Sequence, residues 1–212
     1  ALGGVITGAL TNQAVFSILA LAPLPAIALV LATREERPVG SAASSGADAG
    51  EKDGLLATLS EGVRAQVMAV YTRIAEAESA AHGCPVEQIH FHEVGAMDAV
   101  ADVAAVSLLM HELAPARVTA SPVHVGSGTV RCAHGVLPVP APATARILEG
   151  VPIYGGEVRG ELCTPTGAAL LKHFAAGFGP MPLMRLEKTG YGMGKKDFGD
   201  RANCVRAMIG EA

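Results

Sequence analysis

Residues 90–102 read His90-Phe91-His92-Glu93-Val94-Gly95-Ala96-Met97-Asp98-Ala99-Val100-Ala101-Asp102, which places two imidazoles and three carboxylates within thirteen residues. On a β-strand alternate side chains share a face, so His90 and His92 would lie roughly 6.5–7 Å apart along that face. On a helix Asp98 and Asp102 would lie one turn apart, where like charges repel unless a cation or donor stands between them. The stretch therefore predicts a strand, a turn and a helix N-terminus whose polar groups face one point.

The chemistry of this stretch favours a metal site. Zn, Ni, Co and Mn accept imidazole and a nearby carboxylate completes the ligand set, so the candidate metal ligands are His90, His92, Asp98 and Asp102. A histidine pair with this spacing is also common at polar strand ends, and Asp98 equally suits a helix-dipole role. The number of chargeable groups among apolar neighbours favours a cation over these alternatives.

Two residues are candidate catalytic proton acceptors. Glu93 directly follows the histidine pair, and His134 follows the glycine turn at residues 126–128. A loop histidine of this kind ligates a metal or moves protons, and an exposed residue without a role is the alternative. The remaining histidines are interpreted as structural, surface or capping groups: His82, His111, His124 and His173.

A second polar site is predicted at a helix start. Thr164 is a natural N-cap, and the following proline suits the first helical position because its missing N–H costs nothing there. Free N–H groups at a helix N-terminus attract phosphate or carboxylate, so Thr164, Thr166 and Gly167 are candidate residues for binding an anionic cofactor, with Glu161 able to orient a metal or water. Simple capping is the alternative. The glycine-rich segment 190–196, with Lys195 and Lys196, could cover the phosphate, although a plain β-hairpin turn is the favoured interpretation.

Composition limits the class of protein. The chain has 212 residues, of which 50% are hydrophobic and 4% aromatic, so its core must be built from small aliphatic side chains. The net charge is −4 and no basic run occurs, which argues against a nucleic-acid partner. Four cysteines are scattered without a C-x-x-C pair, which fits buried thiols in a reducing compartment. Cys163 is expected to be a small core residue, and a soft metal ligand is the alternative.

The uncharged run from Ala14 to Ala32 raises the question of a membrane span. Pro23 and Pro25 argue against one, because each lacks an N–H and interrupts the helical hydrogen-bond ladder. No basic segment precedes the run, which argues against a secretory signal. We expect a cytoplasmic protein that does not engage a membrane.

The hydrophobic periodicity predicts an α+β (α/β-like) fold, a mixed sheet packed by two or more long helices. We expect three parts: 1–40, an N-terminal helix-strand piece; 41–54, a flexible linker; and 55–212, the main α+β domain. Expected helices are 14–21, 55–81, 96–113, 141–148 and 165–176. Expected strands are 26–33, 86–91, 118–125, 129–133, 153–154, 183–188 and 204–209.

Several enzyme classes lose their main support. The chain contains no G-x-S-x-G, no Walker A sequence, no H-E-x-x-H and no haem-type C-x-x-C-H. A serine hydrolase, a P-loop NTPase and a zincin protease are therefore disfavoured.

Four motifs in order, HFHEVGAMDAVADV, SPVHVGSGTVRCAHGVLPVPAPAT, GELCTPTGAALLKHF and GYGMGKKDF, are similar to the LarC family of nickel insertion proteins, from about Leu55 to Gly210. The resemblance implies a nickel chelatase (cyclometallase) of the lyase class. It would insert Ni into pyridinium bisthiocarboxylic acid mononucleotide, the precursor of the nickel-pincer cofactor of lactate racemase. It further implies that the piece 1–40 lacks the start of the family domain and that 55–212 binds the metal and the nucleotide. CTP with Mn or Mg is expected in a C-terminal domain outside this chain, and we expect a homo-oligomer.

Two other functions remain open. The same carboxylates could hold Mn or Mg and activate water, as in a metal-dependent hydrolase of a small phosphorylated substrate. Alternatively, the chain is a non-catalytic module that binds or stores nickel. Selection of Ni over Mg would separate insertion from hydrolysis, because imidazole prefers the former ion.

Overall fold

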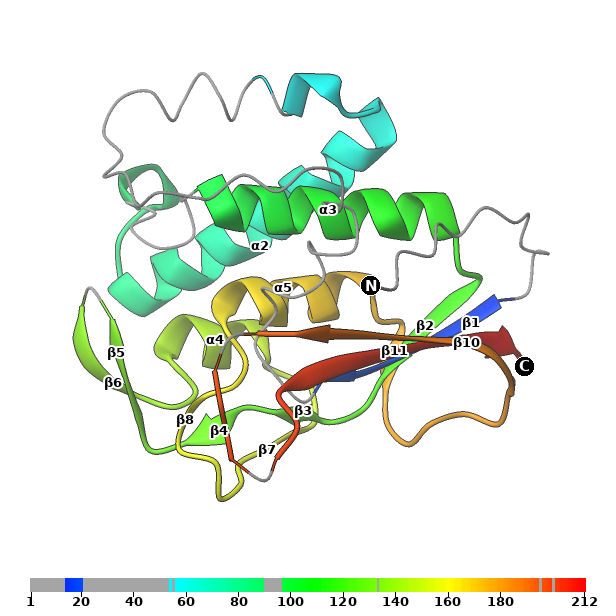
Figure 1. The fold of residues 1–212 in the computed structure, drawn as a ribbon. Coiled ribbons are helices and arrows are strands. Elements are labelled where there is room, and N and C mark those ends of the chain that lie inside the picture. The colour runs from blue at the N-terminus through cyan, green and yellow to red at the C-terminus, as the bar shows by residue number, and fades with distance from the viewer. Residues whose placement is uncertain are drawn as a thin grey trace, which may run out of the picture.

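The computed structural model describes residues 14–20, 54, 56–89, 97–132, 134–194, 196–199 and 201–212. They form an α+β fold in which helices α2 to α5 lie to one side of a mixed β-sheet (Figure 1). The expected fold class is confirmed. The expected strand 26–33 and the expected linker up to residue 53 lie outside the described residues, so the division at residues 40 and 54 stays a prediction.

The main sheet of the described residues has the strand order β10-β11-β1-β2-β9. Strand β1 runs antiparallel to β11 and parallel to β2, and it lies between them. The bounds are β1 Ala14–Ala20, β2 Arg117–Ala120, β9 Gly177–Phe178, β10 Arg185–Met193 and β11 Cys204–Glu211.

The expected helix over 14–21 is wrong, because this segment forms β1. Its valine, phenylalanine and isoleucine suit a pleated strand. The decisive contribution comes from β2 and β11, whose backbone groups on either side accept and donate the hydrogen bonds of a central strand. Those partners lie about a hundred residues or more away, beyond the reach of a local pattern.

The two long helices follow the expected pattern closely. Helix α2, Glu61–His82, begins at Ser60, whose hydroxyl accepts the Val63 amide at 3.4 Å, and ends at Gly83 in a left-handed conformation with φ +66°. Its apolar residues at three- and four-residue spacing are fully buried: Val63, Val67, Val70 and Ile74. Helix α3, Met97–Leu113, packs against α2. Burial of each such side chain contributes about 1.5–3 kcal/mol, which explains why α2 holds its place.

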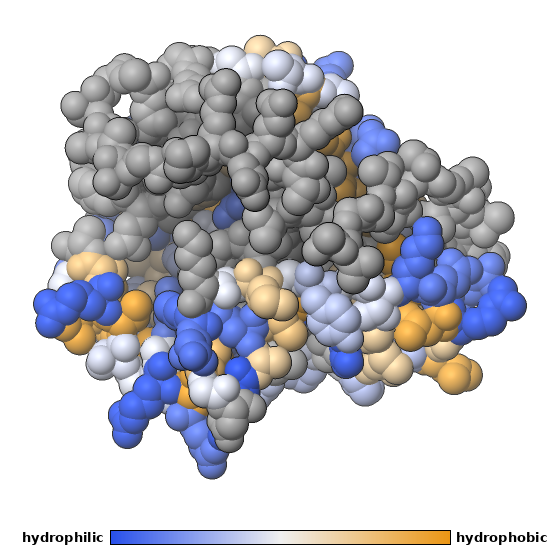
Figure 2. All heavy atoms as spheres, viewed as in Figure 1, coloured by the Kyte–Doolittle hydropathy of each residue, from blue (hydrophilic) through white to orange (hydrophobic). Residues whose placement is uncertain are grey.

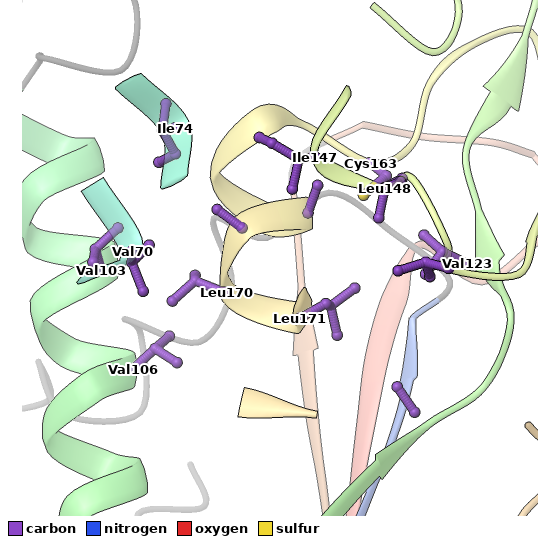
Figure 3. Close-up of a cluster of buried hydrophobic side chains, with 14 of the residues drawn as sticks. Val70, Ile74, Val103, Val106, Val123, Ile147, Leu148, Cys163, Leu170 and Leu171 are labelled. Atoms are coloured by element: carbon purple, nitrogen blue, oxygen red, sulfur yellow. The ribbon is translucent and has the colours of Figure 1, made fainter. Parts of the chain in front are cut away.

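Helix α5, Pro165–Phe174, lies at the centre of the core (Figure 3). Leu170 points toward the valines of α2 and α3, whereas Leu171 points toward Val123 on the sheet side. The short helix α4, Pro142–Ile147, contributes Ile147 beside Cys163. Helix α5 therefore joins the helical layer to the strands, and its N-terminus is held by packing on both sides.

Short strands between the helices depart from the sequence-based expectations. Pro122 separates β2 from β3, Val123–His124, so residues 118–125 form two strands with different partners. Residues 126–127 form β4, Gly126–Ser127, paired with β8, Gly160–Glu161, where a turn was expected. Strand β5, Thr129–Cys132, forms a hairpin with β6, Gly135–Pro138, and β7, Ile153–Tyr154, is confirmed.

Two further expectations are wrong. After Pro85 the chain forms a single 3₁₀ turn, η2, Val86–Gln88, in the described part of the expected strand 86–91. The glycine-rich residues 190–193 extend strand β10, so they do not form a hairpin turn. The connection between β10 and β11 comes later, where Phe198 bridges to Arg201. Among the described residues, no helix is both long and apolar enough to cross a bilayer.

Candidate functional site

The N-terminus of α5 has the expected geometry. The Thr164 hydroxyl accepts the Gly167 amide at 3.2 Å, and Pro165 occupies the first helical position. The Ala168 amide donates to the Thr164 carbonyl at 2.9 Å. Among the described residues the Thr166 amide is the first-turn N–H to which no acceptor is assigned, and its half-buried side chain adds a hydroxyl. Gly167 therefore supports the cap, and Thr166 offers the amide that an anion would meet.

The loop between β10 and β11 brings a cation to the same neighbourhood. The Lys196 ammonium donates to the carbonyl of Glu161 at 3.5 Å, three residues before the Thr164 cap. The Asn203 amide donates to the Lys196 carbonyl at 2.6 Å, which ties the loop to the start of β11. Glu161 itself is half-buried on β8. A positive charge and a helix N-terminus thus approach the same short segment from two directions, an arrangement that attracts phosphate.

A close backbone approach fixes the entry into this segment. Gly126 has φ +89°, and a Cβ atom built there would lie 2.0 Å from the carbonyl oxygen of Gly160 and 3.3 Å from Leu162. Only glycine fits such a contact. The backbones of β4 and β8 are therefore in direct contact. Their register, with Gly126 opposite Glu161, fixes the position of the segment that leads from β8 to Thr164.

The candidate metal ligands are only partly described. His90, His92 and Glu93 lie outside the described residues. Asp98 lies in the first turn of α3, and Asp102, half-buried, lies one turn later on the same helix. Within the described part of the chain, no three histidine, cysteine or carboxylate side chains are arranged to hold a metal ion. The metal assignment stays a prediction.

His134 occupies the two-residue turn of the β5–β6 hairpin, where Cys132 pairs with Gly135. Its ring lies against that of His82, the last residue of α2, with centroids 4.8 Å apart and planes at 55°. The sequence assigned His82 to the surface or to capping. Only the fold brings these two imidazoles together, because 51 residues separate them along the chain.

His124 is buried, and its ring stacks flat on Tyr154 of the neighbouring strand at 4.6 Å. Its Nε2 atom is buried without a hydrogen-bond partner, and a Cβ at Gly156 would come within 2.4 Å of that atom. Burial, and then the charge of Arg201, lower its pKa, so the imidazole is neutral near pH 7. The structural role expected for His124 is consistent with this packing.

Cys163 is a core residue, as expected. It is 5% exposed, and burial, followed by the negative charge of Glu161, raises the pKa of its thiol to about 12. A thiolate is therefore disfavoured at this position, and with it a soft metal ligand. The four cysteines are free thiols.

Comparison with known proteins places the chain in a family. The model of the nickel insertion protein family matches residues 55–212, so the chain belongs to that family. A protein of Desulfitobacterium hafniense is 49% identical over 149 residues, covering 70% of this chain and 37% of the relative. A protein of Geobacillus kaustophilus is 45% identical over 153 residues, covering 72% and 37%. No solved structure matches the chain.

Both relatives are named pyridinium-3,5-bisthiocarboxylic acid mononucleotide nickel insertion protein. A protein of Geobacter metallireducens that is 47% identical, over 73% of this chain and 40% of its own length, is named a putative nickel insertion protein. The chain thus spans about 37–40% of the length of these relatives.

Proposed function

We propose that this chain takes part in nickel insertion into pyridinium-3,5-bisthiocarboxylic acid mononucleotide, the reaction named for its relatives. The observation that carries the proposal is the family match over residues 55–212, with 45–49% identity to the relatives compared. The matched part includes the α5 N-terminus, Lys196 and His134. The substrates are then Ni²⁺ and an anionic nucleotide with two thiocarboxylate groups.

The nucleotide phosphate is proposed to bind at the start of α5. Thr164 caps the helix through the Gly167 amide, and the Thr166 amide and hydroxyl are proposed to donate to the phosphate. Lys196, beside the Glu161 carbonyl, supplies the positive charge. The close backbone approach of Gly126 to Gly160 restricts movement of this segment. A preorganised N-terminus of this kind binds a phosphate without the cost of ordering a loop.

The metal roles follow from the sequence. His90 and His92, with Asp98 and Asp102 nearby on α3, are the proposed nickel ligands, since Ni²⁺ is a borderline ion that takes imidazole and tolerates sulfur. Formation of a nickel–carbon bond releases the proton of a pyridinium carbon. Glu93 or His134 is proposed to accept that proton.

The remaining parts of the proposal come from the family resemblance. We propose a lyase-class chelatase that serves lactate racemase activation and uses CTP with Mn or Mg in a C-terminal domain outside this chain. The four free thiols support a reducing, cytoplasmic location.

A homo-oligomer is supported by β10, an edge strand of the described sheet, where Leu186 and Met193 are 53% and 62% exposed. The face in Figure 2 mixes apolar and hydrophilic residues along its lower part.

The test is a nickel-transfer assay. The purified chain is incubated with Ni²⁺, the bisthiocarboxylic acid mononucleotide, CTP and Mg²⁺, with and without the C-terminal part of a relative, and the nucleotide is analysed by mass spectrometry. Nickel in the product supports the proposal, and its loss in the His90→Ala/His92→Ala double variant supports those ligands. Release of inorganic phosphate from the nucleotide with Mg²⁺ alone would instead indicate the hydrolase, and no product in any combination would refute insertion.

A further inference from the structure

A pair of imidazoles lies at the surface where two separate elements meet. His82 ends α2, His134 lies at the tip of the β5–β6 hairpin, and their ring centroids are 4.8 Å apart. In Figure 1 the hairpin tip stands beside the C-terminal end of α2. Helix α3 begins at this same end of the molecule and packs against α2.

Backbone contacts hold both histidines in place. The α2 terminus is closed by Gly83, whose amide donates to the Ser79 carbonyl, while the Ser79 hydroxyl donates to the Cys84 carbonyl at 2.6 Å. On the other side, the hairpin keeps a regular register from Thr129↔Pro138 to Cys132↔Gly135. The backbone positions of the two histidines are therefore set by a capped helix and a regular hairpin, which favours a binding site.

A carboxylate stands next to the pair. The Glu78 Oε2 atom lies 3.5 Å from His82 Nε2, one helical turn away on α2. Two donor atoms that each bind one ion at about 2.1 Å, at a right angle, lie about 3 Å apart. The 3.5 Å between Glu78 Oε2 and His82 Nε2 is about half an ångström longer than that value. The His82 and Glu78 side chains are 41% and 19% exposed, so small rotations can complete a shared site, which the described residues do not yet form.

We propose that His82 and His134, assisted by Glu78, form the landing site at which Ni²⁺ first binds this chain. The inference rests on the proposed nickel insertion and deepens it by naming residues for the metal. Two imidazoles and one carboxylate suit a borderline dication, and they leave coordination positions open for the sulfur atoms of the nucleotide. His134 then acts as a metal ligand, which leaves Glu93 as the proton acceptor.

The hairpin also connects this landing site to the proposed phosphate site. Strand β5 contacts β8, which carries Glu161, so the base of the hairpin lies near the entry to α5. Three residue steps along β5 cover roughly 10 Å. The hairpin thus runs from the strand that precedes the proposed phosphate site to the imidazole pair.

The test uses Ni²⁺ alone with the full 212-residue chain carrying His90→Ala/His92→Ala, so that binding at the other proposed ligands does not mask the effect, and is measured by isothermal titration calorimetry. His82→Ala and His134→Ala are each expected to weaken nickel binding by at least about 10- to 100-fold, the range seen when even outer-shell groups of metal sites are removed. Because both rings serve one ion, the double variant should lose less than the sum of the two effects. Millimolar Mg²⁺ should not displace the nickel.

His111→Ala is the matched control. His111 is an exposed histidine in the last turn of α3, and its ring lies near Gly62 at the opposite end of α2 from His82. Its removal should leave the nickel affinity unchanged. Circular dichroism checks that each variant is folded, and X-ray absorption of the nickel-loaded chain counts the imidazoles on the metal, with one fewer expected in each single variant.

The outcomes separate this inference from the function. Unchanged nickel affinity and imidazole count in both single variants would overturn the landing site, and so would a wild-type chain that does not bind Ni²⁺. Nickel insertion could still be seen in the transfer assay in the first case. Conversely, both single variants could lose Ni²⁺ binding while the wild-type chain yields no metallated nucleotide in the transfer assay. That result would support the landing site and refute the insertion reaction.

Discussion

The contact between Gly126 and Gly160 allows the sharpest prediction of stability. Gly126→Ala is expected to destabilise the fold strongly, because the new Cβ would lie 2.0 Å from a backbone oxygen of β8 and its residue would keep φ +89°. Gly128→Ala is the matched control. Gly128 has φ +78°, and a Cβ there meets only the Arg159 guanidinium, at 3.7 Å. Both variants place an alanine at positive φ, but only Gly126→Ala also brings the new Cβ into steric clash with the Gly160 carbonyl oxygen.

The magnitudes follow from these two contributions. A non-glycine residue in the left-handed region costs about 1–3 kcal/mol. That is the expected loss for Gly128→Ala, reduced by about 0.4–1 kcal/mol because alanine also restricts the unfolded chain. In Gly126→Ala, β8 must move away from β4, which sacrifices ladder hydrogen bonds of about 0.5–1.5 kcal/mol each together with packing at Leu162. A further loss of about 2 kcal/mol or more is expected.

Urea unfolding followed by circular dichroism measures both free energies of unfolding. The expected order is wild type, then Gly128→Ala, then Gly126→Ala, with the last two separated by about 2 kcal/mol, or about 4–8 °C in Tm. Gly126→Ala should also weaken phosphate binding at Thr164, because Leu162 lies two residues before the cap. Equal losses in the two variants would show that β4 does not press on β8 as described.

Three further predictions concern the helix cap and two buried groups. Thr164→Ala and Ser60→Ala each remove an N-cap and should each cost about 1 kcal/mol in urea unfolding, but only Thr164→Ala should weaken binding of the mononucleotide in calorimetry; equal nucleotide affinities would refute the phosphate site. Because the folded pKa of Cys163 is raised to about 12, stability should fall as pH rises from about 9, by up to about 1.4 kcal/mol per unit, and Cys163→Ala should flatten that slope; an unchanged slope contradicts the burial of the thiol. Burial and Arg73 lower the pKa of His173, so its contribution is present above the ordinary histidine value and is lost as pH falls below it; His173→Gln should unfold with a weaker dependence on acid, and an identical acid profile would argue against this assignment.

Local chemistry alone determined the helices and one end of the proposed site. The start of α5 was predictable because a threonine cap followed by proline acts within one turn, and the end of α2 was predictable because Gly83 adopts a left-handed conformation. Cys163 was placed correctly in the core because a free cysteine usually behaves as a small hydrophobic residue. Each of these features depends on residues a few positions apart.

The tertiary structure decided what depends on distant partners. Residues 14–20 are a strand because β2 and β11 flank them, and the glycine-rich residues 190–193 are a strand because β11 pairs with them. His82 and His134 meet only because a helix end and a hairpin tip are packed at one corner of the fold. A strand needs a partner for its hydrogen bonds and a binding pair needs a shared location, and neither is encoded in the periodicity of a single segment.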